Sequence, residues 1–222
     1  MKIQNNVMNN LVLLFVKQPI AGLVKTRLAK KIGDKAATEL YKCFVEDLLE
    51  KLKVNGFDFR ICLWPPDPPE DIRNWLGTDY WPQEGDDLGQ RMRNVFLRAF
   101  SNSEEKVVLI GSDIPDVPAE YLFESFDALE NCDIVLGPCH DGGYYLIGLS
   151  KKVPEMIFEQ IDWGAKNVYD QTLSKIKQLR LKLYELPKWF DIDTYEDLLQ
   201  FQQRHKSSEA LKTIKMIRQW QI

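Results

Sequence analysis

Short, uninterrupted runs of apolar residues alternate along this chain with segments of helical periodicity. "LVLLFV" (Leu11–Val16) and "VVLI" (Val107–Ile110) are typical of these runs, because every residue in them is apolar and several are β-branched. Strands that are apolar on both faces are typical of parallel sheets covered by helices. The alternation therefore predicts an α/β fold, a three-layer sandwich whose mostly parallel central sheet carries helices on both faces.

The order of these segments also predicts where ligands bind. Strands are expected at residues 11–16, 57–64, 106–110, 133–136, 144–149 and 181–186. Helices are expected at residues 35–52, 72–76, 87–100, 120–129 and 166–179, followed by two closing helices. Asp34 is the predicted cap of the first helix, and Leu211, Ile214 and Ile217, with Trp220 as a further candidate, are expected to pack the last one. Ligands bind beyond the carboxyl ends of such strands, so the loops that follow strands are the places to search.

Length and composition favour one soluble domain. With 222 residues, 45% of them hydrophobic, the chain has enough apolar material for one core, expected over residues 11–222 after a flexible tail at 1–10. The net charge of -4, without a long basic block, argues against a nucleic-acid partner. No apolar run near the N-terminus is long enough for a membrane span, and no signal peptide is recognisable. We expect a cytoplasmic monomer or homodimer.

The loop after the first strand carries three cationic side chains around a glycine. Lys17, Lys25 and Arg27 lie close in sequence to Gly22 in "VKQPIAGLVKTRLAKKIG". Backbone N–H groups and cations placed after a strand can hold phosphate oxygens. The alternative is a solvated basic turn leading into a helix. The position after the first strand favours phosphate binding.

The loop after the central strand presents carboxylates. Asp113 follows Gly111 and Ser112 directly after the strand, where the sheet would hold it rigidly. One or two carboxylates are enough for Mg²⁺, which takes its other ligands from water and substrate phosphates. Asp113 is therefore the predicted metal ligand, whereas Asp116 is expected to cap the helix that follows Pro118.

Two further strings suggest a substrate platform and a second carboxylate. "GPCHDGGYYLIG" places Asp141, Gly142 and Gly143 between two strands, where a hairpin turn and a substrate-binding surface are compatible interpretations. In "DIDTYEDLL", Thr194 is a predicted helix cap with Asp197 three residues later. Asp191 and Asp193 precede that helix and would favour its dipole, but Asp193 could also be a second metal ligand.

Together these strings resemble the nucleotide-diphospho-sugar transferase superfamily with the Rossmann-like GT-A fold. The likeness extends from about Leu11 to Leu199 and is strongest to a bacterial glycosyltransferase group related to the guanylyltransferase that activates phospholactate. It implies that Lys25 and Arg27 contact nucleotide phosphates, that Asp113 and Asp193 bind Mg²⁺ or Mn²⁺, and that the 141–143 turn contacts the substrate. "GDDLGQRM", Gly85–Met92, also resembles the group and would bring Gly89 and Arg91 to the nucleotide.

Two departures from the superfamily bear on its function. The glycine-rich loop of sugar-nucleotide pyrophosphorylases is reduced to Gly22, and the DxD motif of ordinary glycosyltransferases does not follow the central strand. The second departure argues against sugar transfer, and the cationic loop is better suited to a triphosphate. We therefore expect nucleotidyl transfer from a nucleoside triphosphate to a small phosphorylated acceptor, with Lys25 and Asp113 in catalysis. The alternative is glycosyl transfer from a nucleotide-sugar, with Asp141 as base. A non-catalytic nucleotide-binding module is the third interpretation.

Overall fold

The computed structural model describes residues 10–77, 79–205 and 211–221. Most of the tail expected at residues 1–10 lies outside these ranges, and Asn10 already belongs to the first strand. The strands are β1 (Asn10–Lys17), β2 (Phe59–Trp64), β3 (Tyr80–Pro82), β4 (Lys106–Gly111), β5 (Ile134–Pro138), β6 (Tyr144–Ser150) and β7 (Leu183–Glu185). They form one seven-stranded sheet in the order β3-β2-β1-β4-β6-β5-β7.

The sheet is mostly parallel, as predicted. β6 pairs antiparallel with both β4 and β5, and the other pairings are parallel. The helices are α1 (Thr26–Ile32), α2 (Asp34–Val54), α3 (Glu70–Leu76), α4 (Leu88–Ser101), α5 (Ala119–Ala128), η1 (Glu155–Phe158), α6 (Val168–Gln178), α7 (Tyr195–Arg204) and α8 (Lys212–Trp220). None of the helices in the described ranges has the length and apolar character needed to span a membrane.

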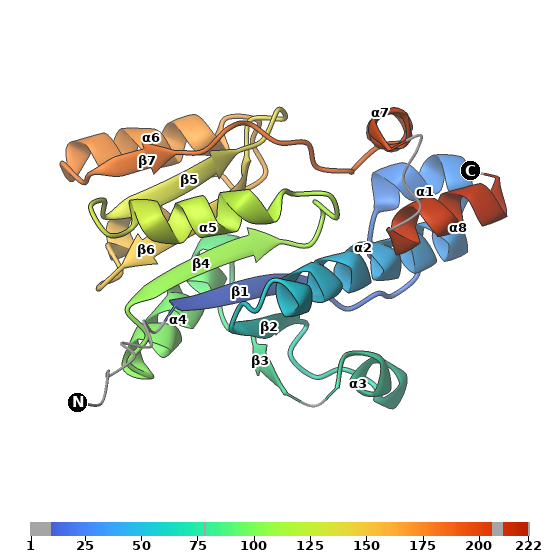
Figure 1. Cartoon of the computed structure of the whole chain (residues 1–222), viewed down its shortest axis with the longest axis horizontal. Coiled ribbons are helices and arrows are strands. Elements are labelled where there is room, and N and C mark those ends of the chain that lie inside the picture. Colours follow the sequence, from blue (N-terminus) through green and yellow to red (C-terminus); the bar gives the residue numbers. More distant parts are fainter. Residues whose placement is uncertain (1–9, 78, 206–210, 222) are drawn as a thin grey trace, which may run out of the picture.

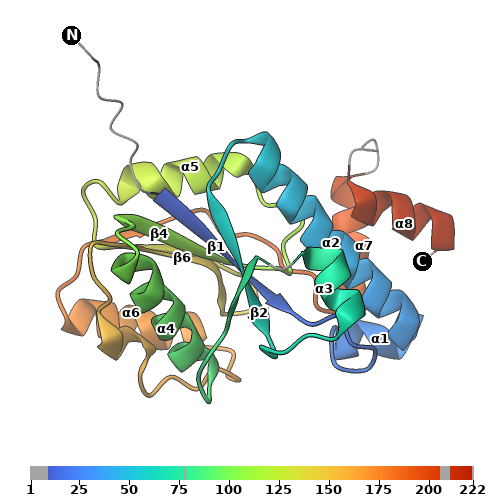
Figure 2. The same cartoon turned by 90° about the horizontal axis from the view of Figure 1, so that it is seen from below.

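Helices cover both faces of the sheet, so the predicted α/β sandwich is confirmed. α2 and α5 lie on one face and α4 and α6 on the other (Figure 2). The pleat of β1 explains how one apolar run supplies both cores: Val12, Leu14 and Val16 enter the α2 and α5 side, while the alternate residues face α4. α1, α7 and α8 gather at the end of the sheet toward which β1 and β4 run (Figure 1).

Several local predictions need correction. α1 occupies residues that the sequence had indicated as a basic loop, and the three-residue β3 was not predicted. The cap of α2 is Gly33, with φ of 85°, and Asp34 is already the first helical residue. In α8, Ile214 and Ile217 are buried as expected, whereas Trp220 remains 40% exposed.

Candidate active site

Three segments predicted to bind ligands meet beyond the carboxyl ends of β1 and β4. Lys17 ends β1, Asp113 follows β4, and the turn that contains Asp141 joins β5 to β6. A cavity of about 310 Å³ is lined by residues of all three segments. A second cavity of about 190 Å³ shares Lys17, Tyr41 and Asp113 with the first.

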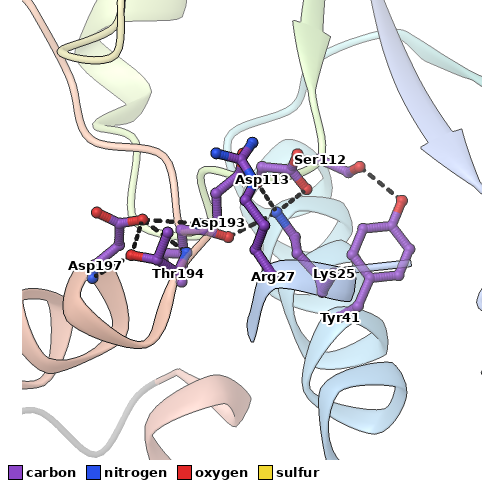
Figure 3. A network of polar contacts seen from close by, with 9 residues as sticks. Lys25, Arg27, Tyr41, Ser112, Asp113, Asp193, Thr194 and Asp197 are labelled. Carbon is purple, nitrogen blue, oxygen red and sulfur yellow. Dashed lines mark hydrogen bonds and ion pairs between the residues drawn. The ribbon is translucent and has the colours of Figure 1, made fainter. Parts of the chain in front are cut away.

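The ammonium of Lys25 lies between two carboxylates (Figure 3). Its Nζ is 2.7 Å from Asp113 Oδ1 and 2.9 Å from Asp193 Oδ1, and it donates a hydrogen bond of 2.6 Å to the Ile192 carbonyl. The Lys25 backbone has the left-handed conformation, with φ of 49°, immediately before α1. Few non-glycine residues adopt this conformation.

Burial makes this ion cluster different from the exposed cationic loop that the sequence suggested. The Lys25 side chain is only 4% exposed, whereas that of Arg27 is 64% exposed and lies 2.5 Å from Asp193 Oδ2. Burial opposes the charge of Lys25, but Asp113 and Asp193 outweigh it and raise the pKa of the ammonium. Burial likewise opposes ionisation of Asp193, but Lys25 and Arg27 hold its pKa below the usual value.

Asp193 reaches the site because its segment runs beside the end of β4. The Ile192 N–H donates to the Asp113 carbonyl at 2.9 Å. The predicted cap then starts α7: Thr194 Oγ1 accepts from the Asp197 N–H, and the Asp197 carboxylate accepts from the Thr194 N–H. The "DID" string, distant in sequence from the central strand, is therefore adjacent to it in space.

Tyr41 and Ser112 complete the junction of β1 and β4, and sequence reasoning missed both. The Tyr41 hydroxyl accepts a hydrogen bond of 2.8 Å from the Lys17 N–H and lies 2.8 Å from Ser112 Oγ (Figure 3). Burial and the nearby Asp113 raise the pKa of Tyr41, so the phenol stays neutral. In the sequence, Tyr41 is one more residue of an amphipathic helix, and only its position at the strand ends reveals this role.

The larger cavity is aromatic at one end. Trp64, Tyr144 and Trp163 line it together with Arg91. The Arg91 guanidinium lies 4.5 Å from the Trp64 ring centroid, and its buried Nε has no hydrogen-bond partner among the described residues. Burial lowers the pKa of Arg91. Arg91 can therefore offer donors and a stacking surface to a ligand, and its role in nucleotide binding stays a prediction.

The glycines predicted to contact the nucleotide or the substrate have different surroundings. Gly22 is exposed, with φ of 81°. A side chain on Gly89 would lie 2.4 Å from the Phe158 carbonyl oxygen, and Gly89 is not among the residues that line either cavity. Packing against Phe158 is therefore enough to require a glycine at position 89, and its contact with the nucleotide stays a prediction. Gly142 has φ of 94° and lies against the Lys166 carbonyl, while Gly143 lines the larger cavity.

Asp141 belongs to a tight turn and to a second group of potential metal ligands. Its Oδ1 accepts a hydrogen bond of 2.9 Å from the Gly143 N–H, so the hairpin interpretation is correct, and Asp141 also lines the larger cavity. Ligand atoms of Cys139, Asp141 and Asp191 lie within 4.8 Å of one another. Burial, followed by Asp141 and Asp193, raises the pKa of Asp191 to about 6. Neither Asp191 nor Cys139 was predicted from the sequence to belong to the site.

The predicted metal ligands fit a divalent cation chemically. Asp113 and Asp193 contact the same ammonium, so both carboxylates already converge on one positive charge. Carboxylate oxygens are the ligands that Mg²⁺ and Mn²⁺ prefer. The site therefore has oxygen ligands for such a metal, and the same two carboxylates contact Lys25 Nζ in this structure.

Asp116 has a different role from the predicted helix cap. Pro118 is the cap of α5, and the Asp116 side chain is 2% exposed. Its carboxylate accepts hydrogen bonds from Trp189 Nε1 and Arg204 Nη2 and lies 2.9 Å from His205 Nε2. Asp116 therefore connects the loop after β4 to the end of α7.

Known proteins resemble this chain over most of its length. The 2-phospho-L-lactate guanylyltransferase of Methanocaldococcus jannaschii is 25% identical over 81% of this chain and 77% of its own length. A candidate nucleotide-diphospho-sugar transferase from Desulfovibrio desulfuricans G20 has a crystal structure that covers 95% of this chain and 94% of its own, with 39% identity and a TM-score of 0.90.

A more distant likeness shows the fold alone. Rv0371c of Mycobacterium tuberculosis, solved in complex with manganese, is 16% identical over 87% of this chain and 97% of its own, with a TM-score of 0.53. The names of the first two relatives agree with the transferase class and the superfamily resemblance predicted from the sequence. The model of the bacterial family DUF2064, described as "Uncharacterized protein conserved in bacteria", matches residues 48–165, and the chain belongs to that family.

Proposed function

We propose that this protein is a metal-dependent nucleotidyltransferase that transfers a nucleotide from a nucleoside triphosphate to a small phosphorylated acceptor. The observation that carries the proposal is the junction of an aromatic cavity with a cavity lined by Lys17, Lys25 and Arg27. A nucleoside suits the first cavity, because its base can stack on an aromatic ring. A triphosphate suits the second, because cations neutralise its charge. The guanylyltransferase relative supports this assignment.

The reaction needs little covalent chemistry from the protein. A phosphate oxygen of the acceptor attacks the α-phosphorus and forms the new P–O bond. The bond to the α–β bridging oxygen breaks, and pyrophosphate leaves with its electron pair. An acceptor phosphate is already ionised near neutral pH, so no general base is required. Catalysis then depends on positioning and on charge stabilisation by Lys17, Lys25 and Arg27.

Asp113 and Asp193 are the proposed ligands of Mg²⁺ or Mn²⁺. That Rv0371c was solved in complex with manganese is consistent with a divalent metal in this fold. When bound, such a metal supplies Lewis-acid stabilisation of the phosphate oxygens.

Gly22 is proposed to let the loop pass close to the phosphates, and Arg91 is proposed to contact the nucleoside. Asp141, Gly142 and Gly143 form the proposed acceptor side, since Asp141 and Gly143 line the larger cavity.

Glycosyl transfer is the alternative that one observation favours: Asp141, the candidate base, lies at the cavity and is exposed to solvent.

A direct assay separates the two reactions. The protein is incubated with Mg²⁺ and each nucleoside triphosphate plus a panel of phosphorylated metabolites, and pyrophosphate is measured. In parallel, it receives nucleotide-sugars and sugar acceptors, and released nucleoside diphosphate is measured. We expect acceptor-dependent pyrophosphate. Nucleoside diphosphate release without pyrophosphate from any triphosphate would contradict the proposal.

A further inference from the structure

Lys25 contacts both carboxylates that are proposed to bind the metal. Its Nζ makes two ion pairs and a hydrogen bond to the Ile192 carbonyl, and its side chain is almost fully buried. An ammonium and a divalent metal in contact with the same carboxylate oxygens would repel each other strongly at this separation. The two cations therefore compete for Asp113 and Asp193.

We propose that Lys25 excludes divalent metal from the nucleotide-free site and moves to the triphosphate when it binds, so that nucleotide and metal enter as a coupled pair. This inference rests on the proposed function, because the incoming phosphates supply the new partner for the ammonium. It adds a role to Lys25, which gates metal binding as well as contacting phosphate.

The surroundings of Lys25 allow this movement. The cavity of about 190 Å³ is lined by Lys25 together with Lys17 and Arg27, so phosphate oxygens would lie next to the ammonium. A lysine side chain has a flexible four-carbon stem and can turn from one acceptor to another while its backbone stays fixed. The Lys25 backbone itself is held at the start of α1, since its carbonyl accepts from the Ala29 N–H.

The energetics give the coupling its direction. A metal that binds alone must break both ion pairs and leave a buried ammonium with no anionic partner and only the Ile192 carbonyl as acceptor, which is unfavourable. A triphosphate removes this penalty because its anionic oxygens accept hydrogen bonds from the ammonium. By thermodynamic linkage, each ligand then strengthens the binding of the other by the same factor.

Binding of Mn²⁺ in the absence of nucleotide tests the exchange without any assay of activity. Free Mn²⁺ is measured by electron paramagnetic resonance during titration of the wild type and of Lys25→Met, whose side chain has similar length and no charge. We expect Lys25→Met to lower the Kd for Mn²⁺ by about tenfold, within the range of about 5- to 150-fold typical of coupled sites. Lys25→Arg keeps the positive charge and should bind Mn²⁺ as weakly as the wild type.

Lys30→Met is the matched control, because Lys30 is exposed on α1 and its replacement removes the same charge. It should leave the Kd for Mn²⁺ unchanged. An unchanged or higher Kd for Mn²⁺ in Lys25→Met, or an equal decrease in Lys30→Met, would overturn the exchange. If Lys25→Met does not fold, Lys25→Gln is measured in its place. Its amide is neutral and can still donate to the Ile192 carbonyl, and its Kd for Mn²⁺ should be lower than that of the wild type.

A second titration separates this inference from the proposed function. Nucleoside triphosphate is titrated calorimetrically into the same variants in the presence of EDTA. Lys25→Met should bind the triphosphate more weakly than Lys30→Met, because a phosphate contact is lost. If Mn²⁺ binding improves but triphosphate binding does not change, Lys25 only blocks the metal, and the coupled entry of nucleotide and metal is overturned. If triphosphate binding weakens but Mn²⁺ binding does not improve, the phosphate role stands and the exchange is wrong.

Discussion

At the scale of single residues, Asp113 connects the sheet to the proposed metal. Its side chain is 42% exposed and contacts Lys25, which keeps Asp193 and the Ile192 carbonyl as other partners. Asp113→Asn retains the size of the side chain and removes its charge. We expect the affinity for magnesium-nucleotide to fall by about tenfold or more, equivalent to at least about 1.4 kcal/mol. Calorimetry measures this, with circular dichroism as the check on folding. Wild-type affinity in Asp113→Asn would contradict the metal assignment.

Lys25 and Arg27 should respond differently to truncation, although the sequence suggests equal roles. Arg27→Ala removes a side chain that is 64% exposed, so unfolding free energy should change by less than about 0.5 kcal/mol while triphosphate binding weakens. Lys25→Ala leaves two carboxylates without their buried cation and should destabilise the fold more. Urea unfolding of both variants, beside triphosphate titrations, makes the comparison. Equal stability of the two variants would argue against a structural role for the ion cluster.

Gly89 illustrates a residue whose type is set by packing. A Cβ there would lie 2.4 Å from the Phe158 carbonyl oxygen and 2.7 Å from the Trp163 ring. Gly89→Ala should therefore destabilise the protein by about 1–3 kcal/mol, as overpacking usually does. Gly111→Ala is the control, since nothing lies within 4 Å of a Cβ at that position. Urea unfolding midpoints should differ between the two variants, and identical midpoints would show that α4 can shift freely.

At the scale of elements, Asp116 connects the loop after β4 to the end of α7 through its contacts with Arg204 and His205. Its carboxylate accepts hydrogen bonds from Trp189 and Arg204. In Asp116→Asn, the amide NH₂ group would face these two N–H donors, so one hydrogen bond would be lost. We expect a loss of about 1–3 kcal/mol in unfolding free energy and faster hydrogen exchange at the end of α7. Asp127→Asn, an exposed substitution on α5, is the control. Unchanged exchange in α7 would mean that other contacts hold this helix.

At the scale of the whole molecule, the site draws on segments from Lys17 to Asp193, so ligand binding should stabilise the entire fold. At a ligand concentration of about 100 Kd, linkage adds about 2.7 kcal/mol. For a chain of this size, that corresponds to a Tm increase of about 5–10 °C. Differential scanning fluorimetry with each nucleoside triphosphate and Mg²⁺ measures the shift. A Tm that stays constant with all four triphosphates would contradict a nucleotide site.

The layered α/β fold and the loops that surround the site could be predicted from the amino-acid sequence. Apolar runs such as Leu11–Val16 carry a local signal, because their residues are buried wherever the strand is placed in the sheet. The cap at Thr194 is equally local, since its partner Asp197 is three residues away. By contrast, β3 is too short for any periodicity, and α1 begins without a side-chain cap.

The pairing of the charged residues depends on the tertiary structure. Lys25 and Asp193 are 168 positions apart, and Asp116 meets His205 across 89 positions. Neither contact has a signal in the local pattern, because the sheet order and the return of the chain after β7 set both distances. Burial of Lys25 likewise depends on which segments cover it. For this reason the sequence indicated the types of residue at the site, whereas the fold determined that a lysine lies between the two carboxylates.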